Sequence, residues 1–251
     1  MGDDIGEAFG AYVTERVHDA SCLFISGGST GPKLFSQLID TATVLNVLSD
    51  LVIAQVDERV VPSNSTESNQ YCFREDFLEK LRSQVVTATN FKPMIEADLD
   101  AEISKAFEGQ IVEREPERSD QVLMSQLRAY GLRASKSYEE FVRTHIADAV
   151  VHLGIGLDGH IASLFPNSDA LESPRYVDIN FDNTGTNRHL RTTLTFTAIT
   201  RARQVVVVVS GSNKAGIIRR VLSSNDTPAS RLLTRKTTWI LDKEAAKEIS
   251  K

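Results

Sequence analysis

Asp158 and His160 are the two residues of this sequence best suited to acid–base chemistry. They lie in a turn with three glycines at 154–159, directly after an apolar run at 150–153 that is typical of a buried strand. An imidazole titrates near neutral pH, so a histidine beside a carboxylate can take a proton from water and return it. Because open α/β sheets place their sites beyond the carboxyl ends of strands, we expect a general acid–base site here.

Charged residues also follow a second apolar run, at 51–56. Asp57 and Arg59 come directly after it, and Asn69 follows a few residues later, next to a serine that can cap a helix over about 68–81. One interpretation is a solvated turn with a local ion pair. The other is that these side chains lie at the same sheet edge as the Asp158 turn and contribute to one site.

An earlier glycine turn lies between an apolar strand at 22–26 and a helix that opens near Pro32. Unpaired backbone N–H groups at such a turn can bind phosphate. The residues concerned are Gly27, Gly28, Ser29 and Thr30. A plain tight turn is an alternative, and so is a G-x-S-x-G nucleophile elbow with Ser29 as nucleophile. The elbow is disfavoured because several strands normally precede it in that fold.

Two basic residues are candidates for binding an anion. Arg191 begins the segment RTTLTF, and Lys214 opens a helix after the run of valines at 205–209. Most such residues are solvated surface charges. However, a cation at a helix N-terminus opposes the helix dipole, which suggests that an anion binds nearby.

The turn at 154–159 permits two further interpretations. It satisfies G-x-G-x-x-G with Asp178 about 20 residues downstream, as in dinucleotide folds, but prolines interrupt the region where a crossover helix should run. A zinc site would use His152, Asp158 and His160. Strand alternation does not bring His152 to the same edge, so a core histidine or one paired with backbone is favoured there.

The composition is that of an ordinary globular protein. The chain has 251 residues, is 41% hydrophobic and 25% charged, and carries a net charge of −6, which argues against a general nucleic-acid binder. The two cysteines form no disulfide or metal pattern, the acidic N-terminus lacks the apolar region of a signal peptide, and no apolar run could span a membrane. We therefore expect a soluble cytoplasmic protein.

Strand-like and helix-like segments alternate along the chain, which predicts an α/β fold with a mostly parallel sheet and helices on both faces, Rossmann-like. Expected strands are 22–26, 51–56, 149–153, 191–196, 204–210 and 238–241. Expected helices are 5–17, about 68–81, 137–145, 213–222 and 242–249. We expect a single domain over 1–251. The charged stretch Glu96–Asp120 is interpreted as a mobile, solvated excursion, with a functional lid as the alternative.

Several motifs occur in order between about Leu23 and Ala246. They are SGGST at 26–30, VDERVVP at 56–62 with SN at 68–69, LGIGLDGHIASLFP at 153–166, RTTLTF at 191–196, SGSNKAGII at 210–218, TPASRLL at 227–233 and WILDKEAA at 239–246. Together they resemble the 6-phosphogluconolactonase family, part of a larger group with the glucosamine-6-phosphate deaminases and a NagB/RpiA-like architecture. Deaminases of that group carry an asparagine–glutamate pair after the histidine, where this chain has the lactonase-like ASLFP.

The resemblance implies hydrolysis of 6-phospho-D-glucono-1,5-lactone to 6-phosphogluconate, the second step of the oxidative pentose phosphate pathway. His160 is then the general base, Asp158 its positioning partner, and Arg59 a group that stabilises negative charge. Substrate contacts are expected from Gly27, Gly28, Ser29, Thr30, Asp57, Asn69, Arg191 and Lys214.

We expect no cofactor, no metal, and no nucleic-acid or membrane partner. The expected oligomeric state is a monomer or a weak homodimer. An amino-sugar-phosphate deaminase or isomerase and a non-catalytic sugar-phosphate sensor are the alternatives.

Overall fold

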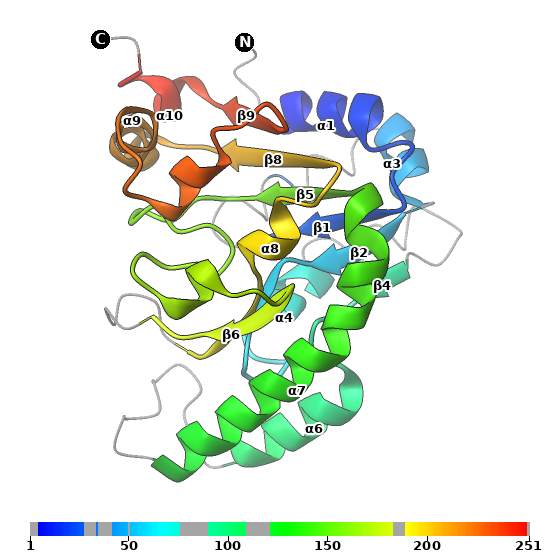
Figure 1. The fold of residues 1–251 in the computed structure, drawn as a ribbon. Coiled ribbons are helices and arrows are strands. Elements are labelled where there is room, and N and C mark those ends of the chain that lie inside the picture. The colour runs from blue at the N-terminus through cyan, green and yellow to red at the C-terminus, as the bar shows by residue number, and fades with distance from the viewer. Residues whose placement is uncertain are drawn as a thin grey trace.

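The computed structural model describes residues 5–27, 34, 42–49, 51–75, 90–108, 121–182 and 189–249. Within these ranges, six strands form a sheet in the order β4-β2-β1-β5-β8-β9, and every neighbouring pair is parallel (Figure 1). The strands are β1 (Cys22–Ile25), β2 (Val52–Gln55), β4 (Asn90–Lys92), β5 (Ala149–Leu153), β8 (Gln204–Val209) and β9 (Thr237–Leu241). The predicted α/β class with a mostly parallel sheet is confirmed.

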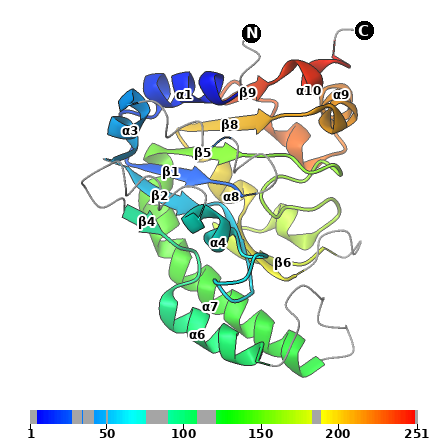
Figure 2. The same cartoon turned by 180° about the vertical axis from the view of Figure 1, so that it is seen from behind.

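The central strands are buried on both faces. In β8 the odd-numbered valines of 205–209 belong to the same core cluster as Tyr138, and the even-numbered ones to the cluster that contains Phe9. Such a strand must be apolar at every position, which is why the run of valines predicted it. The helices that supply the covering side chains are α1 (Ile5–Arg16), α3 (Ala42–Ser49), α7 (Gln121–His145), α9 (Ala215–Ser223) and α10 (Lys243–Ala246). Helices α1 and α3 lie side by side in both views (Figures 1 and 2).

A second, antiparallel sheet was not predicted from the sequence. It has the order β3-β7-β6, formed by β3 (Asp57–Arg59), β6 (Val177–Asn180) and β7 (Arg191–Leu194). Val56 joins the two sheets, because its N–H donates to Ile25 O and its carbonyl accepts from Leu194 N. The chain thus passes from β2 directly into β3. This leaves the polar side chains of β3 at the carboxyl edge of the parallel sheet.

The prediction of a solvated excursion over Glu96–Asp120 is wrong for its first half. Helix α6 (Ala97–Ala106) packs beside α7 at the far end of the molecule from β9 (Figures 1 and 2). Its residues Leu99 and Ile103, followed by Phe107, are buried in one cluster with side chains of α7. This four-residue spacing is the apolar stripe of an amphipathic helix, which the high charge of the segment obscures. Residues 109–120 lie outside the described residues.

The remaining described helices are short. They are α4 (Asn69–Phe73), α8 (Phe196–Ile199) and four 3₁₀ turns at Ile146–Asp148, Asp169–Glu172, Ser212–Lys214 and Pro228–Leu232. Ser68 caps α4 as predicted, since its side chain accepts from Tyr71 N. Residues 76–81 of the predicted helix lie outside the described residues. Of the helices described, none combines the length and apolar character needed to cross a bilayer.

Candidate active site

The turn after β5 is built around two glycines that cannot carry a side chain. Gly159 has φ +87°, and a Cβ there would lie 2.7 Å from Cβ of Thr227. A Cβ on Gly156 would lie 2.1 Å from Nδ1 of His160, so the imidazole packs directly over this glycine. Backbone bonds from Gly156 N to His160 O and from Gly159 N to Gly156 O close the turn. The two glycines therefore allow the turn to fold back on itself and leave room for the imidazole of His160.

Asp158 holds the His160 ring as predicted. Its Oδ1 lies 2.6 Å from Nδ1 of His160 and also accepts from the His160 backbone N–H at 3.1 Å. Burial raises the pKa of Asp158, but the hydrogen bonds and charge of His160 outweigh this and bring it below its ordinary value. A carboxylate at Nδ1 favours the tautomer with the proton on Nδ1, which leaves Nε2 as the basic nitrogen.

Lys214 joins the same turn. It ends the 3₁₀ turn after β8, directly before α9, and its Nζ donates to Ile155 O at 2.7 Å. Burial lowers the pKa of Lys214, and the negative charge of Asp158 opposes that shift. The parallel pairing of β5 with β8 brings these loops together, because both strands end at the same edge of the sheet.

Asp57, Asn69 and Gly27 form a second group. The Asn69 amide donates to Asp57 O at 2.9 Å, and a Cβ on Gly27 would lie 2.4 Å from Oδ1 of Asn69. Gly27 is therefore a position where the Asn69 side chain closely approaches the backbone. Gly28, Ser29 and Thr30 lie outside the described residues.

Glu58 fixes this group, although it was not singled out from the sequence. The carboxylate is buried and accepts from the backbone N–H groups of Asn69 and Gln70, both at 2.7 Å, at the start of α4. Gln55 and Ser68 donate to it from their side chains. Burial raises the pKa of Glu58, and these hydrogen bonds oppose the rise. A carboxylate at a helix N-terminus is a cap, so Glu58 ties β3 to α4.

Ser163 connects the two groups and was also missed as a site residue. Its hydroxyl donates to Oδ2 of Asp57 at 2.7 Å, and its backbone N–H donates to Thr193 Oγ1 at 3.1 Å. The Asn180 amide donates to the Ser163 carbonyl at 2.7 Å. A polar residue in an otherwise apolar stretch was the available signal. Only the tertiary fold shows that its partner is 106 positions away.

The two predicted arginines lie opposite each other on neighbouring strands. Arg59 of β3 pairs with Arg191 of β7, which places their side chains on one face of the small sheet. Arg191 Nη1 lies 3.8 Å from Oδ2 of Asp57, and Nη1 of Arg59 donates to Glu67 O. Burial, followed by repulsion from Arg59, lowers the pKa of Arg191 to about 10.

Phe165 brings the arginine pair and the histidine turn to one place. Its ring lies 5.1 Å from the His160 ring and 5.9 Å from Cζ of Arg191. The described part of the predicted site is thus one constellation. It combines a carboxylate-held imidazole, a buried lysine and a pair of arginines, which suits proton transfer on an anionic substrate.

His152 is a core residue, as the sequence favoured. Its Nδ1 accepts from Ser26 N at 3.4 Å, its ring lies 5.0 Å from that of Phe9, and burial lowers its pKa to about 3. No group of three metal-binding side chains is found among the described residues. The zinc interpretation through His152 therefore has no support in the described part of the chain.

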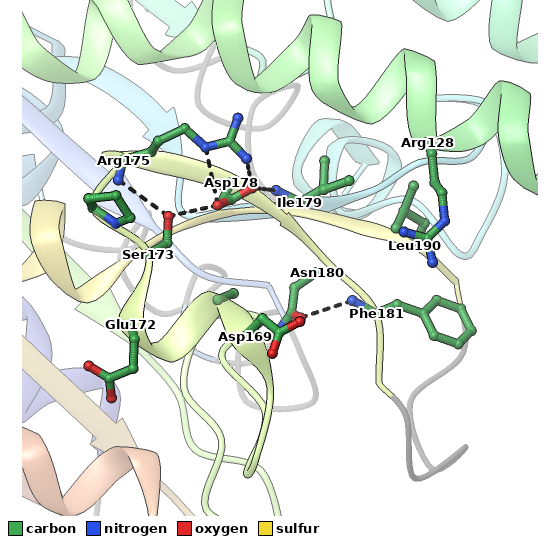
Figure 3. A pocket seen from close by; sticks show the side chains of 12 residues that line it. Arg128, Asp169, Glu172, Ser173, Arg175, Asp178, Ile179, Asn180, Phe181 and Leu190 are labelled. Atoms are coloured by element: carbon green, nitrogen blue, oxygen red, sulfur yellow. Dashed lines mark hydrogen bonds and ion pairs between the residues drawn. The ribbon is translucent and has the colours of Figure 1, made fainter.

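A separate cavity of about 550 Å³ lies between α7, β6 and the 3₁₀ turn at Asp169–Glu172 (Figure 3). On one side Arg175 and Ser173 bond to Asp178, and on the other Arg128 extends beside Leu190. None of the predicted site residues lines it. Because Arg175 and Asp178 in this cavity are already paired with each other, the residues around His160 are the better candidate for the active site.

Comparison with known proteins gives one consistent result. The family model described as "Glucosamine-6-phosphate isomerases/6-phosphogluconolactonase" matches residues 3–240. A 6-phosphogluconolactonase of Mycobacterium bovis is 30% identical, with 96% of this chain and 90% of that protein covered. The human 6-phosphogluconolactonase is 26% identical, with 97% and 89% covered. The solved structure of 6-phosphogluconolactonase from Trypanosoma cruzi has a TM-score of 0.75 at 23% identity, covering 99% of this chain and 94% of that one.

Proposed function

The chain belongs to the glucosamine-6-phosphate isomerase/6-phosphogluconolactonase family, and from that premise we propose that it hydrolyses 6-phospho-D-glucono-1,5-lactone to 6-phosphogluconate. The observation that carries the proposal is the 2.6 Å contact between Asp158 and His160 at the carboxyl edge of the sheet. A lactone needs an activated water, stabilisation of an oxyanion and a proton for the departing ring oxygen. The imidazole supplies the first and the last of these.

In the proposed reaction, Nε2 of His160 takes a proton from water while the water oxygen attacks the lactone carbonyl carbon. The carbonyl π electrons move to oxygen, giving a tetrahedral oxyanion. When the carbonyl re-forms, the bond to the ring oxygen breaks and His160 returns the proton to that oxygen. Asp158 stabilises the intermediate imidazolium through Nδ1–H.

The other site residues bind substrate and stabilise charge. Arg59 stabilises the developing negative charge, and Asp57 with Asn69 binds sugar hydroxyls. Lys214, Arg191 and the turn of Gly27, Gly28, Ser29 and Thr30 hold the phosphate. Phosphate at a lysine beside a helix N-terminus and at an arginine is a charge-assisted arrangement.

Lactonase chemistry fits the segment after His160 better than deamination does. A deaminase would need a further proton-handling carboxylate there, whereas Ala162 and Ser163 are followed by Leu164 and Phe165, both buried. The buried Ser163 hydroxyl is already bonded to Asp57. Lactone hydrolysis needs no second carboxylate, because the carbonyl is already electrophilic.

The test is to generate the lactone in situ with glucose-6-phosphate dehydrogenase and to measure its decay above spontaneous hydrolysis. His160→Gln should lower kcat by about 10²–10⁴-fold with little change in KM. The matched control is His18→Gln, at an exposed histidine. Wild-type protein without acceleration refutes the lactonase, and normal turnover by His160→Gln removes His160 from the mechanism.

We further propose a single-domain cytoplasmic enzyme that needs no metal or cofactor and is a monomer or weak homodimer. Neither of the two cysteines, Cys22 and Cys72, forms a disulfide, which supports a reducing compartment. Sedimentation of the purified chain checks the oligomeric state.

A further inference from the structure

His189 is a buried histidine beside the arginine pair that the proposed mechanism does not use. It precedes Arg191 by two residues and is 4% exposed. Its Nε2 lies 3.4 Å from Oε2 of Glu67, without the geometry of a hydrogen bond. Nε of Arg59 is likewise buried and without a hydrogen-bond partner in the described part of the chain. Two buried polar atoms without a hydrogen-bond partner among the described residues thus belong to β3 and to the residue two positions before β7, the strand that pairs with β3.

The backbone at His189 is also unusual. Its φ of +69° is left-handed, which is uncommon for a residue other than glycine but is tolerated by histidine and asparagine. The next carbonyl, Leu190 O, accepts from Val60 N at 2.8 Å, so pairing with the β3 side holds this conformation. Backbone conformations of this kind persist when the surrounding structure holds them, and they are frequent at functional sites.

Three charged groups face the imidazole. Arg59 comes from β3, Arg191 from β7, and Glu67 from the segment before α4. Burial, followed by repulsion from Arg191, lowers the pKa of His189 to about 4, while Glu67 acts in the opposite direction. In the protein without ligand, His189 is therefore neutral at physiological pH.

We propose that His189 takes up a proton when the substrate phosphate binds at Arg191, beside Arg59, and that the imidazolium then forms an ion pair with Glu67. The dianion offsets the repulsion from the two arginines, whereas the Glu67 carboxylate stays in place. The new ion pair fixes the segment that leads into Asn69. His189 is thus a positioning residue that couples substrate binding to protons, and this role rests on the proposed function.

The experiment is calorimetric titration of the intact protein with 6-phosphogluconate at about pH 6, in buffers of different ionisation enthalpy. The dependence of the measured enthalpy on the buffer gives the number of protons taken up. Wild-type protein should take up roughly half a proton or more beyond the His189→Asn variant. Asparagine is chosen because it tolerates the left-handed backbone but does not titrate.

Glu67→Gln should also reduce the uptake, and it serves as the second variant if His189→Asn does not fold. His18→Asn, at an exposed histidine in another part of the fold, should behave as wild type. D-gluconate, which lacks the phosphate, should give no difference between wild type and variant. In lactone hydrolysis, His189→Asn should raise KM severalfold and leave kcat within about twofold.

Equal proton uptake by wild type and His189→Asn refutes the proposal, as does failure of wild type to bind 6-phosphogluconate. The lactone assay is a separate measurement. Wild-type turnover together with equal uptake overturns only the role of His189, and absence of turnover overturns the lactonase itself.

Discussion

Replacing Ser163 by alanine tests whether the two halves of the site are joined as described. The hydroxyl is fully buried and donates to Oδ2 of Asp57, whose side chain is itself buried. Alanine removes one oxygen and almost no volume, so the effect comes from the lost hydrogen bond. Arg191 Nη1 lies 3.8 Å from the same carboxylate oxygen, so it does not replace the lost hydrogen bond at this distance.

The magnitude follows from the kind of bond that is removed. A buried hydrogen bond to a charged group contributes about 1.5–3 kcal/mol to the free energy of unfolding. For 251 residues, with an unfolding entropy of about 2.1 cal/mol/K per residue, that corresponds to a fall in Tm of about 3–6 °C. If about 1.4 kcal/mol of it is also lost in substrate binding, because Asp57 is less well held, KM rises about tenfold.

Ser135→Ala is the matched control. Ser135 is also buried, but its hydroxyl donates to Gly131 O within α7, a local neutral bond. Its removal should cost about 1 kcal/mol or less and leave KM unchanged. Thermal unfolding and steady-state lactone hydrolysis of both variants provide the comparison. Equal Tm losses and equal KM values for the two variants would show that the hydrogen bond from Ser163 to Asp57 does not hold the site together.

Three further predictions concern the turn, the lysine and metals. Gly159→Ala should destabilise the protein by about 1–3 kcal/mol and lower kcat, since φ is +87° and the new Cβ meets Thr227. Gly216→Ala, in helix α9 with nothing within 4 Å of the new Cβ, should leave the stability unchanged or raise it by up to about 1 kcal/mol when both variants are compared by thermal unfolding. Because burial lowers the pKa of Lys214, its positive charge is lost, as the pH rises, sooner than the charge of an ordinary lysine. The wild-type KM should therefore increase toward alkaline pH, and a Lys214→Met profile without that increase would identify the lysine, whereas an unchanged profile would exclude it. Exhaustive treatment with a chelator should leave kcat unchanged, and a loss restored by a divalent ion would contradict the metal-free mechanism.

The sequence was most informative where the residue types in a short segment are explained by the local structure of that segment alone. The valines of 205–209 predicted a strand buried on both faces because such a strand is apolar at every position and favours β-branched side chains. The glycine turn with Asp158 and His160 predicted a carboxylate-held imidazole because the two residues are close in the chain, and the 2.6 Å contact is as expected.

Short and charged elements were harder to predict. Strand β3 is three residues long, which is too short for an alternating apolar pattern in its sequence to predict that it pairs with β7. Helix α6 was misjudged because its charges outnumber its apolar stripe. Only the first of these errors bears on the site, since the β3–β7 register sets Arg59 beside Arg191.

The sequence alone thus determined the fold class, the turn that holds the imidazole and the family to which the chain belongs. Tertiary structure decided which distant groups meet there: Ser163 with Asp57, Glu58 with the start of α4, Lys214 with Ile155, and His189 with Glu67. The physical reason is the range of the interactions. Turns and buried strands follow from neighbours in the chain, whereas ion pairs and hydrogen bonds between segments depend on sheet order and register, which no local pattern encodes.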